Sequence, residues 1–325
     1  LSLQDDANRT ALGLYLHQII ETGDLSFAMA ESQALRAGAS TRSQAHWALT
    51  LHSQLLTELR LMSPDDLATA RRADFDETRD ITKAAPGSTF LARRMITHWV
   101  NKVQNERAMQ GQAAEQQDSP IPKMIYQYWD QPEVPAQITS FTNSWIKAAG
   151  FEHTLYNREQ AIALLRAEFG PRWVQAFRMT NNPAEESDLL RLCLLAKNGG
   201  IWADADDVLY GTLTGPLSGG FGLVGYQDTV GGATANNFIA VRPRHPAIVY
   251  AAKLARASLL QKSGETAWFR TGPGILTRAI ARYIASAKPE VLENDLKLIP
   301  HHILLNDIAM TNPAAYKFSS KHWAR

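Results

Sequence analysis

The sequence has almost no cysteine and no long apolar run, and each absence excludes a class of protein. Cys193 is the only cysteine among 325 residues, so neither an intrachain disulfide nor a zinc site built on several cysteines can form. No stretch approaches the roughly 18 uninterrupted apolar residues of a membrane-spanning helix, and no signal peptide is recognisable. We therefore expect a cytoplasmic protein without an integral membrane span; peripheral membrane contact and secretion as an effector stay open.

The chain also lacks a surplus of charge, with 33 basic and 32 acidic side chains. A nucleic-acid-binding protein needs a marked excess of Lys and Arg on its surface, so no nucleic-acid partner is expected. Residues 1–119 hold 15 acidic and 12 basic side chains, whereas the remainder holds 17 and 21. The small positive net charge of residues 120–325 suits an anionic small-molecule ligand in that part of the chain.

Residues 1–119 are predicted to form a helical bundle or accessory region, which packs as a cap or docks a partner. Ser63-Pro64-Asp65-Asp66 has the features of a helix start: a capping side chain, a proline in the first turn and acids near the positive dipole end. Apolar side chains recur every three or four residues in two further segments, 41–62 and 90–103. They are Trp47, Leu51, Leu55, Leu59 and Met62, then Leu91, Met95, Trp99 and Val103. The polar stretch 110–119 is the predicted linker.

From residue 120 onward strand and helix patterns alternate, which predicts an α/β domain over 120–325 with helices on both faces of a sheet. Asn157 is expected to cap one helix, and Pro183 and Gly199 to begin and end another. The expected strands are 123–129, 153–156, 201–206, 222–226 and 238–242. The expected helices are 140–149, 157–169, 183–197, 245–261 and 273–287.

The stretch GGIWADADD, residues 199–207, is the first candidate site. Ligands of open α/β sheets bind beyond the carboxyl ends of strands, where these acids lie. Because alternate residues of a strand share a face, Trp202, Asp204 and Asp206 are expected to point one way. Carboxylates in this position suit Mg²⁺ or Mn²⁺ held together with substrate phosphates, although acids at strand ends are also common as solvated turn residues. Asp207 is either a second-shell ligand or a turn residue.

The helix before this strand strengthens the case, because Asp188 and Arg191 are three residues apart and share one helix face. The simple interpretation is an intrahelical ion pair. The functional one is an acceptor for sugar hydroxyls beside a cation for a diphosphate.

At this point the sequence resembles a known family. AEESDLLRLCLLAKNGGIWADADDVLYG is similar to the signature of the DXD-containing glycosyltransferases of family 32, which include α-1,6-mannosyltransferases and bacterial capsular or lipopolysaccharide sugar transferases. The glucosyltransferase domains of large clostridial toxins are wider relatives. IPKMIYQYWDQPEVP resembles the opening strand of the family, with Tyr126 where histidine is usual. Fainter echoes are NNFIAVRPRHPAI, TGPGILTRAI and the closing KHW.

The resemblance implies a GT-A fold, a Rossmann-like sheet that binds a nucleotide-diphospho-sugar, here following an all-α N-terminal region. It implies catalytic roles for Asp188, Arg191, Asp204 and Asp206. It implies metal binding by Asp206, Asp204 and His322, with His322 or Trp323 closing over the phosphates; an ordinary surface histidine is the alternative for His322. It implies donor binding by Tyr128, Trp129, Asp188, Arg191, Trp202, Asp204, Asn237, Gly272 and Trp323. Trp129 would stack on the base. Packing is the alternative role for Tyr128 and Trp129, and turn formation for Asn236, Asn237 and the loop 271–274, whose backbone N–H groups would otherwise line the acceptor side.

The implied function is metal-dependent, retaining transfer of a hexose from a UDP- or GDP-sugar to a glycan or lipid-linked saccharide, with Mn²⁺ or Mg²⁺ as cofactor. Two alternatives stay open: a toxin-like transferase that modifies a protein side chain, and a non-catalytic module that binds a nucleotide-sugar or glycan.

Overall fold

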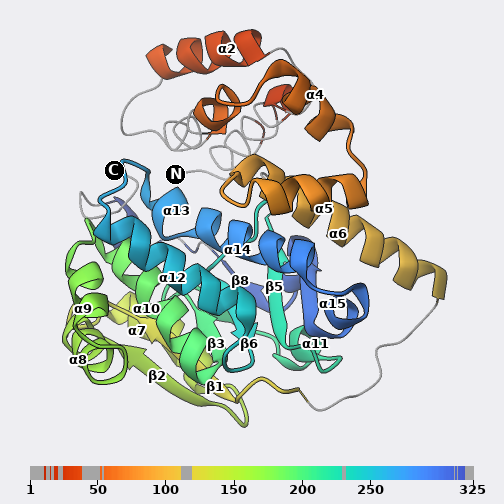
Figure 1. Cartoon of the computed structure of the whole chain (residues 1–325). Helices are drawn as coiled ribbons and strands as arrows, with labels where there is room; N and C mark the ends of the chain where they lie inside the picture. Colours follow the sequence, from red (N-terminus) through yellow and green to blue (C-terminus); the bar gives the residue numbers. More distant parts are fainter. Residues whose placement is uncertain are drawn as a thin grey trace.

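The computed structural model describes residues 55–110, 119–228, 232–310, 312 and 314–318, together with residues 11, 15, 18–20, 25–38 and 52. A six-stranded sheet in the order β2-β1-β3-β6-β5-β7 forms its centre (Figure 1). The strands are β1 (Met124–Tyr128), β2 (Glu152–Tyr156), β3 (Gly200–Ala203), β5 (Leu223–Gln227), β6 (Phe238–Val241) and β7 (Leu296–Pro300). The predicted α/β fold is confirmed.

The sheet is mixed rather than uniformly parallel. Strand β1 pairs in parallel with both β2 and β3, and β5 pairs in parallel with β7, whereas β6 runs antiparallel to β3 and β5. Because β6 runs the opposite way, the chain that enters it lies beside the carboxyl end of β3. Its backbone continues the pairing one step further, since the N–H of Asp204 donates to the carbonyl of Asn237 at 3.0 Å. A second, two-stranded sheet pairs β4 (Val208–Leu209) with β8 (Ile308–Ala309).

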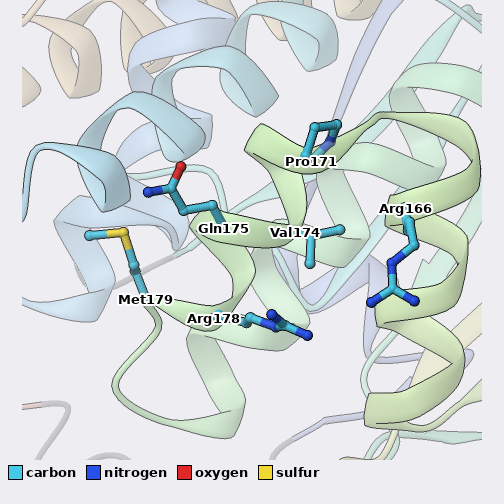
Figure 2. A pocket seen from close by; sticks show the side chains of 6 residues that line it. All are labelled: Arg166, Pro171, Val174, Gln175, Arg178 and Met179. Atoms are coloured by element: carbon cyan, nitrogen blue, oxygen red, sulfur yellow. The ribbon is translucent and has the colours of Figure 1, made fainter.

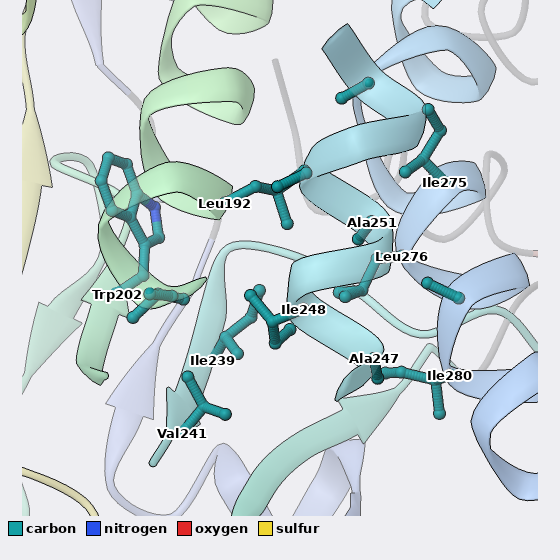
Figure 3. Packing of buried hydrophobic residues seen from close by; sticks show 14 of the residues in the cluster. Leu192, Trp202, Ile239, Val241, Ala247, Ile248, Ala251, Ile275, Leu276 and Ile280 are labelled. Carbon is teal, nitrogen blue, oxygen red and sulfur yellow. The ribbon is translucent and has the colours of Figure 1, made fainter. Parts of the chain in front are cut away.

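Helices cover both faces of the large sheet, as predicted. On one face the largest apolar core includes Trp202, Ile239 and Val241 of the sheet with Leu192 and Ile248 above them, and Figure 3 shows these side chains between the helices. On the other face a smaller core gathers around the buried Trp145. The helices of this part are α7 (Ala136–Ile146), α8 (Arg158–Glu168), α9 (Pro171–Arg178), α10 (Pro183–Asn198), α11 (Thr214–Leu217), α12 (Pro246–Leu260), α13 (Ala267–Arg270), α14 (Pro273–Ser286), α15 (Pro289–Asp295) and α16 (His301–Leu304), with a 3₁₀ turn η1 at Ala315–Phe318.

Local sequence signals explain where the central helices begin and end. Asn157 and Gln160 form a reciprocal capping box at the start of α8. Asn182 caps α10, with Pro183 in its first turn. The helix ends at Gly199, which adopts a φ of +66° that an L residue rarely takes. The helix α10 and the strand β3 are therefore joined with no intervening loop, which delivers the acidic stretch to the edge of the sheet.

The described helices of the first third are α2 (Leu25–Gly38), α4 (Pro64–Arg72), α5 (Phe75–Ala84) and α6 (Thr89–Gln110). Ser63 caps α4 as predicted, and Leu91, Met95 and Trp99 of α6 are buried. Of the stripe predicted over 41–62, Leu55 and Leu59 are buried, whereas Trp47 and Leu51 lie outside the described residues.

Helix α6 packs against α14, and its apolar face belongs to the same core as the sheet (Figure 1). The boundary near residue 119 stays a prediction, since residues 111–118 are outside the described part. Within that part, no helix combines the length and the apolar character needed to cross a membrane.

Candidate active site

The site lies where β3 ends and the first turns of α10 begin. Strand β3 stops at Ala203 and the chain turns at once, with the N–H of Asp207 donating to the carbonyl of Asp204 at 3.0 Å. The prediction that the strand runs to residue 206 is therefore wrong at its end. As a result Asp204 and Asp206 do not simply alternate along one strand face, and each has its own set of partners.

Arg191 binds two carboxylates of the site at once. Its Nη2 lies 2.7 Å from Oδ1 of Asp204, and its Nη1 lies 3.3 Å from Oδ1 of Asp188. The guanidinium side chain is only 3% exposed, whereas that of Asp204 is 32% exposed. The pair three residues apart on α10 is thus present, as the spacing predicts, and it is extended by a second, longer-range pair to the residue after β3.

Trp202 lies beneath this pair rather than on the open side of it. Its side chain is fully buried, its indole N–H donates to Oδ1 of Asp204 at 2.9 Å, and the Arg191 guanidinium stacks over its ring at 4.9 Å. A ring without exposed surface cannot touch a donor directly. We therefore correct the predicted role of Trp202: it orients Asp204 and Arg191.

Asp188 is buried and has two neutral donors besides Arg191. The Thr271 hydroxyl donates to its Oδ2 at 2.9 Å and the Asn236 amide donates to its Oδ1 at 2.8 Å. Burial raises the pKa of Asp188 from its ordinary value to about 6, against the opposing effects of Arg191, Thr271 and Asn236. The carboxyl thus changes its charge close to neutral pH.

Asn236 and Asn237 are both candidates from the sequence, with Asn237 assigned to the donor site, but it is Asn236 that contacts Asp188. The loop 271–274 contributes the Thr271 hydroxyl, where only backbone N–H groups were expected. The Asn237 amide instead donates to Oδ2 of Asp207 at 2.7 Å, and its Oδ1 accepts from the Tyr226 hydroxyl at 2.5 Å. Asp207 is itself 2% exposed, so it shapes the turn. The sequence signal for this region was two consecutive asparagines before a strand. That signal does not show which of the two side chains reaches Asp188.

Gly272 serves close packing and does not offer its N–H to a ligand. The N–H groups of Thr271 and Gly272 both donate to the carbonyl of Ala267 at 3.0 Å, so the predicted use of these two groups does not hold. A Cβ on Gly272 would lie 3.3 Å from Oδ2 of Asp188 and 3.2 Å from the Ala267 carbonyl. The missing side chain lets the turn before α14 approach Asp188.

Asp206 is half-buried and is held by the chain's C-terminal part. The Tyr316 hydroxyl donates to its Oδ2 at 2.9 Å, and the Asn312 amide donates to its backbone carbonyl at 2.9 Å. Burial raises the pKa of the Tyr316 phenol well above its ordinary value, with the charges of the nearby aspartates acting in the same direction. The phenol therefore stays protonated and acts as the donor in this hydrogen bond.

The end of β1 supplies the two predicted aromatic residues. Tyr128 is 6% exposed and its hydroxyl donates to Oε2 of Glu186 at 2.6 Å, while Arg158 pairs with Oε1 of the same carboxylate. Tyr128 therefore anchors the first turn of α10. Trp129 is half-buried and makes an edge contact with the Tyr316 ring, with centroids 5.2 Å apart. Within the described part of the chain its buried indole N–H has no hydrogen-bond partner.

A divalent cation at this site would be held through Asp206. Asp204 is already paired with Arg191, whereas Asp206 accepts from the neutral hydroxyl of Tyr316. The described residues contain no cluster of three His, Cys, Asp or Glu side chains able to hold a metal. A hard cation here would need oxygen ligands from a substrate and water besides Asp206, which is how Mg²⁺ is usually held. His322 and Trp323 lie outside the described residues.

A hollow on the surface lies elsewhere, between α8 and α9 (Figure 2). It measures about 480 Å³ and none of the predicted site residues line it. Its walls are Arg166, Pro171, Val174, Gln175, Arg178 and Met179. The candidate active site thus rests on its polar network and not on the depth of a cavity.

A family model described as "Glycosyltransferase sugar-binding region containing DXD motif" matches residues 135–220, the segment that holds Asp188, Arg191, Asp204 and Asp206. The chain carries a DXD glycosyltransferase domain. This confirms the resemblance on which the sequence analysis relied, and it supports a transferase enzyme.

Three curated proteins are similar to this chain over part of its length, and two of them are named as glycosyltransferases. An uncharacterised glycosyltransferase, L373, of Acanthamoeba polyphaga mimivirus is 26% identical over 183 residues, which is 55% of this chain and 70% of that protein. The initiation-specific alpha-1,6-mannosyltransferase of Schizosaccharomyces pombe is 27% identical over 194 residues, or 50% of this chain and 49% of that one. A toxin of Photorhabdus asymbiotica is 35% identical over 122 residues, or 36% of this chain and 4% of the toxin.

Among solved structures, the PaToxG glycosyltransferase aligns over 72% of this chain and 94% of its own, with 17% identity and a TM-score of 0.41. This overlap is too loose to bear on function.

Proposed function

We propose that this DXD glycosyltransferase domain transfers a hexose from a UDP- or GDP-sugar to a glycan or lipid-linked saccharide, with retention of anomeric configuration and with Mn²⁺ or Mg²⁺ as cofactor. The observation that carries the proposal is that the two acids of the motif, Asp204 and Asp206, contact different partners. Asp204 forms an ion pair with Arg191 of α10, whereas Asp206 accepts a hydrogen bond from the Tyr316 hydroxyl of the C-terminal segment. The first is suited to orient a sugar and the second to attract a cation.

Each residue of the site has a physical role in this reaction. Departure of a nucleoside diphosphate builds negative charge, and Asp206 would hold a divalent cation that neutralises this charge. Asp188 and Asp204 would accept hydrogen bonds from donor hydroxyls. Arg191 holds both carboxylates in place, because its guanidinium lies 2.7 Å from Asp204 and 3.3 Å from Asp188. Trp129 would support the base.

Retention needs either a nucleophile on the protein or attack from the side of the leaving group. Asp188 and Asp204 are both engaged by Arg191, which lowers their power as nucleophiles. We infer that the acceptor hydroxyl attacks on the face from which the diphosphate departs, and that the diphosphate guides it.

The test is donor hydrolysis and transfer by the purified chain, with UDP-glucose, UDP-galactose, UDP-GlcNAc and GDP-mannose, each with and without Mn²⁺. Asp206→Asn should lower the cation-dependent rate about 100-fold or more. Asp80→Asn is the matched control, since that acid is 78% exposed and pairs with Lys83; its rate should equal that of the wild type. An unchanged rate in Asp206→Asn would show that the site is assigned wrongly.

The same assay separates the alternatives. Tight binding of a nucleotide-sugar with no turnover, in the presence of Mn²⁺ and of saccharide and protein acceptors, favours a binding module. Transfer to protein but not to glycan arrays favours a toxin-like acceptor.

A further inference from the structure

Tyr316 contacts two parts of the candidate site, the acidic turn after β3 and the end of β1. Its hydroxyl donates to Oδ2 of Asp206, and its ring meets that of Trp129 at an interplanar angle of 84°. Asp206 is the predicted cation ligand and Trp129 the predicted base-binding residue. Nothing in the local sequence around Tyr316 indicates this contact, because 110 residues separate it from Asp206.

The segment that carries Tyr316 is anchored by contacts of its own. Ala314 is buried in a small apolar cluster with Ile138 and Ala205. The N–H of Ala315 donates to the Gln137 side chain at 3.1 Å. The Asn312 amide donates to the carbonyls of Asp206 and Ala309, both at 2.9 Å. Loss of the Tyr316 hydroxyl alone should therefore leave the segment in place.

The hydroxyl is well suited to prepare Asp206 for a cation. A carboxylate that accepts a hydrogen bond on one oxygen loses rotational freedom, and its other oxygen is held in a defined direction. The partner of Asp206 here is a hydroxyl group, whereas that of Asp204 is the guanidinium of Arg191. Hydrogen-bond partners of metal-ligating carboxylates typically contribute a factor of about 10 to 100 to metal affinity.

We propose that Tyr316 is a positioning residue of the donor site: its hydroxyl orients Asp206 for a divalent cation, and its ring edge holds Trp129 in the orientation that receives the base. This inference rests on the proposed function. The hydroxyl and the ring can be tested separately, because the hydroxyl would affect cation binding and the ring would affect nucleotide binding.

The experiment measures Mn²⁺ binding by electron paramagnetic resonance, and binding of UDP and GDP without metal by calorimetry. Tyr316→Phe keeps the ring and removes the hydroxyl, so Mn²⁺ affinity should fall about ten-fold or more while metal-free nucleotide affinity stays at the wild-type value. Tyr316→Ala should lower both affinities. Tyr210→Phe, at a tyrosine that is 59% exposed, is the matched control and should change neither. Thermal unfolding of each variant verifies the fold.

The outcomes separate this inference from the proposed function. If Asp206→Asn abolishes Mn²⁺ binding but Tyr316→Phe binds Mn²⁺ as tightly as the wild type or more tightly, the role of Tyr316 is refuted and the proposed metal site stands. If Asp206→Asn binds Mn²⁺ like the wild type, the metal site and the role of Tyr316 both fail. If Tyr316→Phe and Tyr316→Ala lower metal-free nucleotide affinity equally, the ring has no part in holding Trp129.

Discussion

Arg191 and Asp204 form a 2.7 Å ion pair that joins helix α10 to the residue after β3. The two acids of the DXD motif therefore have different partners, because Asp204 pairs with a guanidinium and Asp206 accepts from the Tyr316 hydroxyl. Trp202 supports the pair from below, with its ring under the guanidinium and its N–H on the carboxylate. The DXD motif is therefore part of a polar network that also includes Asp188 and Arg191 of helix α10.

Arg191→Lys should reduce donor turnover about 100-fold without unfolding the chain. Lysine keeps the positive charge but is a point donor that cannot span Asp188 and Asp204 as the planar fork does. The rate with the best donor of the panel and the midpoint of thermal unfolding are measured together. Arg172→Lys, at an exposed arginine of α9, is the control. A turnover within two- to three-fold of the wild type would argue against the bridging role.

Thr271→Val should shift the acid side of the pH–activity profile to higher pH. The Thr271 hydroxyl stabilises the ionised form of Asp188, so its loss raises the pKa of this carboxyl further above about 6. Turnover at pH 6 should fall about ten-fold, in line with the loss of a hydrogen bond to a charged group, and recover as the pH is raised.

A matched control is Thr277→Val, which removes a buried hydroxyl from the same helix region but one that donates to the Pro273 carbonyl. Its profile should keep the wild-type inflection even if its stability falls. Equal profiles for the two valine variants would contradict a specific effect on Asp188.

Gly199→Ala should lower the free energy of unfolding by more than about 1 kcal/mol. The residue has a φ of +66°, and a Cβ would meet the nitrogen of Pro243 at 2.6 Å and the Val241 carbonyl at 2.7 Å. Gly215→Ala, where no atom lies within 4 Å of the added carbon, should change stability little. Denaturant unfolding of both variants compares them directly, and similar midpoints would show that the junction of α10 and β3 tolerates a side chain.

Asp295→Asn should destabilise the fold at neutral pH and flatten its acid sensitivity. Burial alone would raise the pKa of Asp295, but hydrogen bonds from His245, Arg242 and Tyr283 outweigh it and hold this pKa well below its usual range. A lowered pKa stabilises the folded state above the unfolded-state pKa of about 4 and loses this contribution as the pH falls below it.

Unfolding of the wild type and of Asp295→Asn is therefore compared between pH 7 and pH 2. The difference in stability between them should shrink as the pH falls below about 4. A difference that stays constant over this range would mean that the ionised form of Asp295 is not what the cluster stabilises.

The sequence by itself determined the features that depend on neighbours in the chain. The capping box of Asn157 and Gln160, the start of α10 at Pro183, its end at Gly199 and the Asp188–Arg191 pair all follow from side chains within four residues of each other. Their geometry is set by the helix itself. The alternation of strands and helices predicted an α/β sheet for the same reason.

Only the tertiary structure decided which distant side chains complete the site. Asn236, Thr271 and Tyr316 meet the site aspartates across 48, 83 and 110 residues. Antiparallel β6 places Asn236 beside Asp188, and the packing of α14 and of the C-terminal segment brings the other two. Trp202 and Tyr128 are buried rather than open to a ligand for the same reason: helices pack over them. Strand periodicity gives the face on which a side chain lies, but what covers that face depends on segments remote in the sequence.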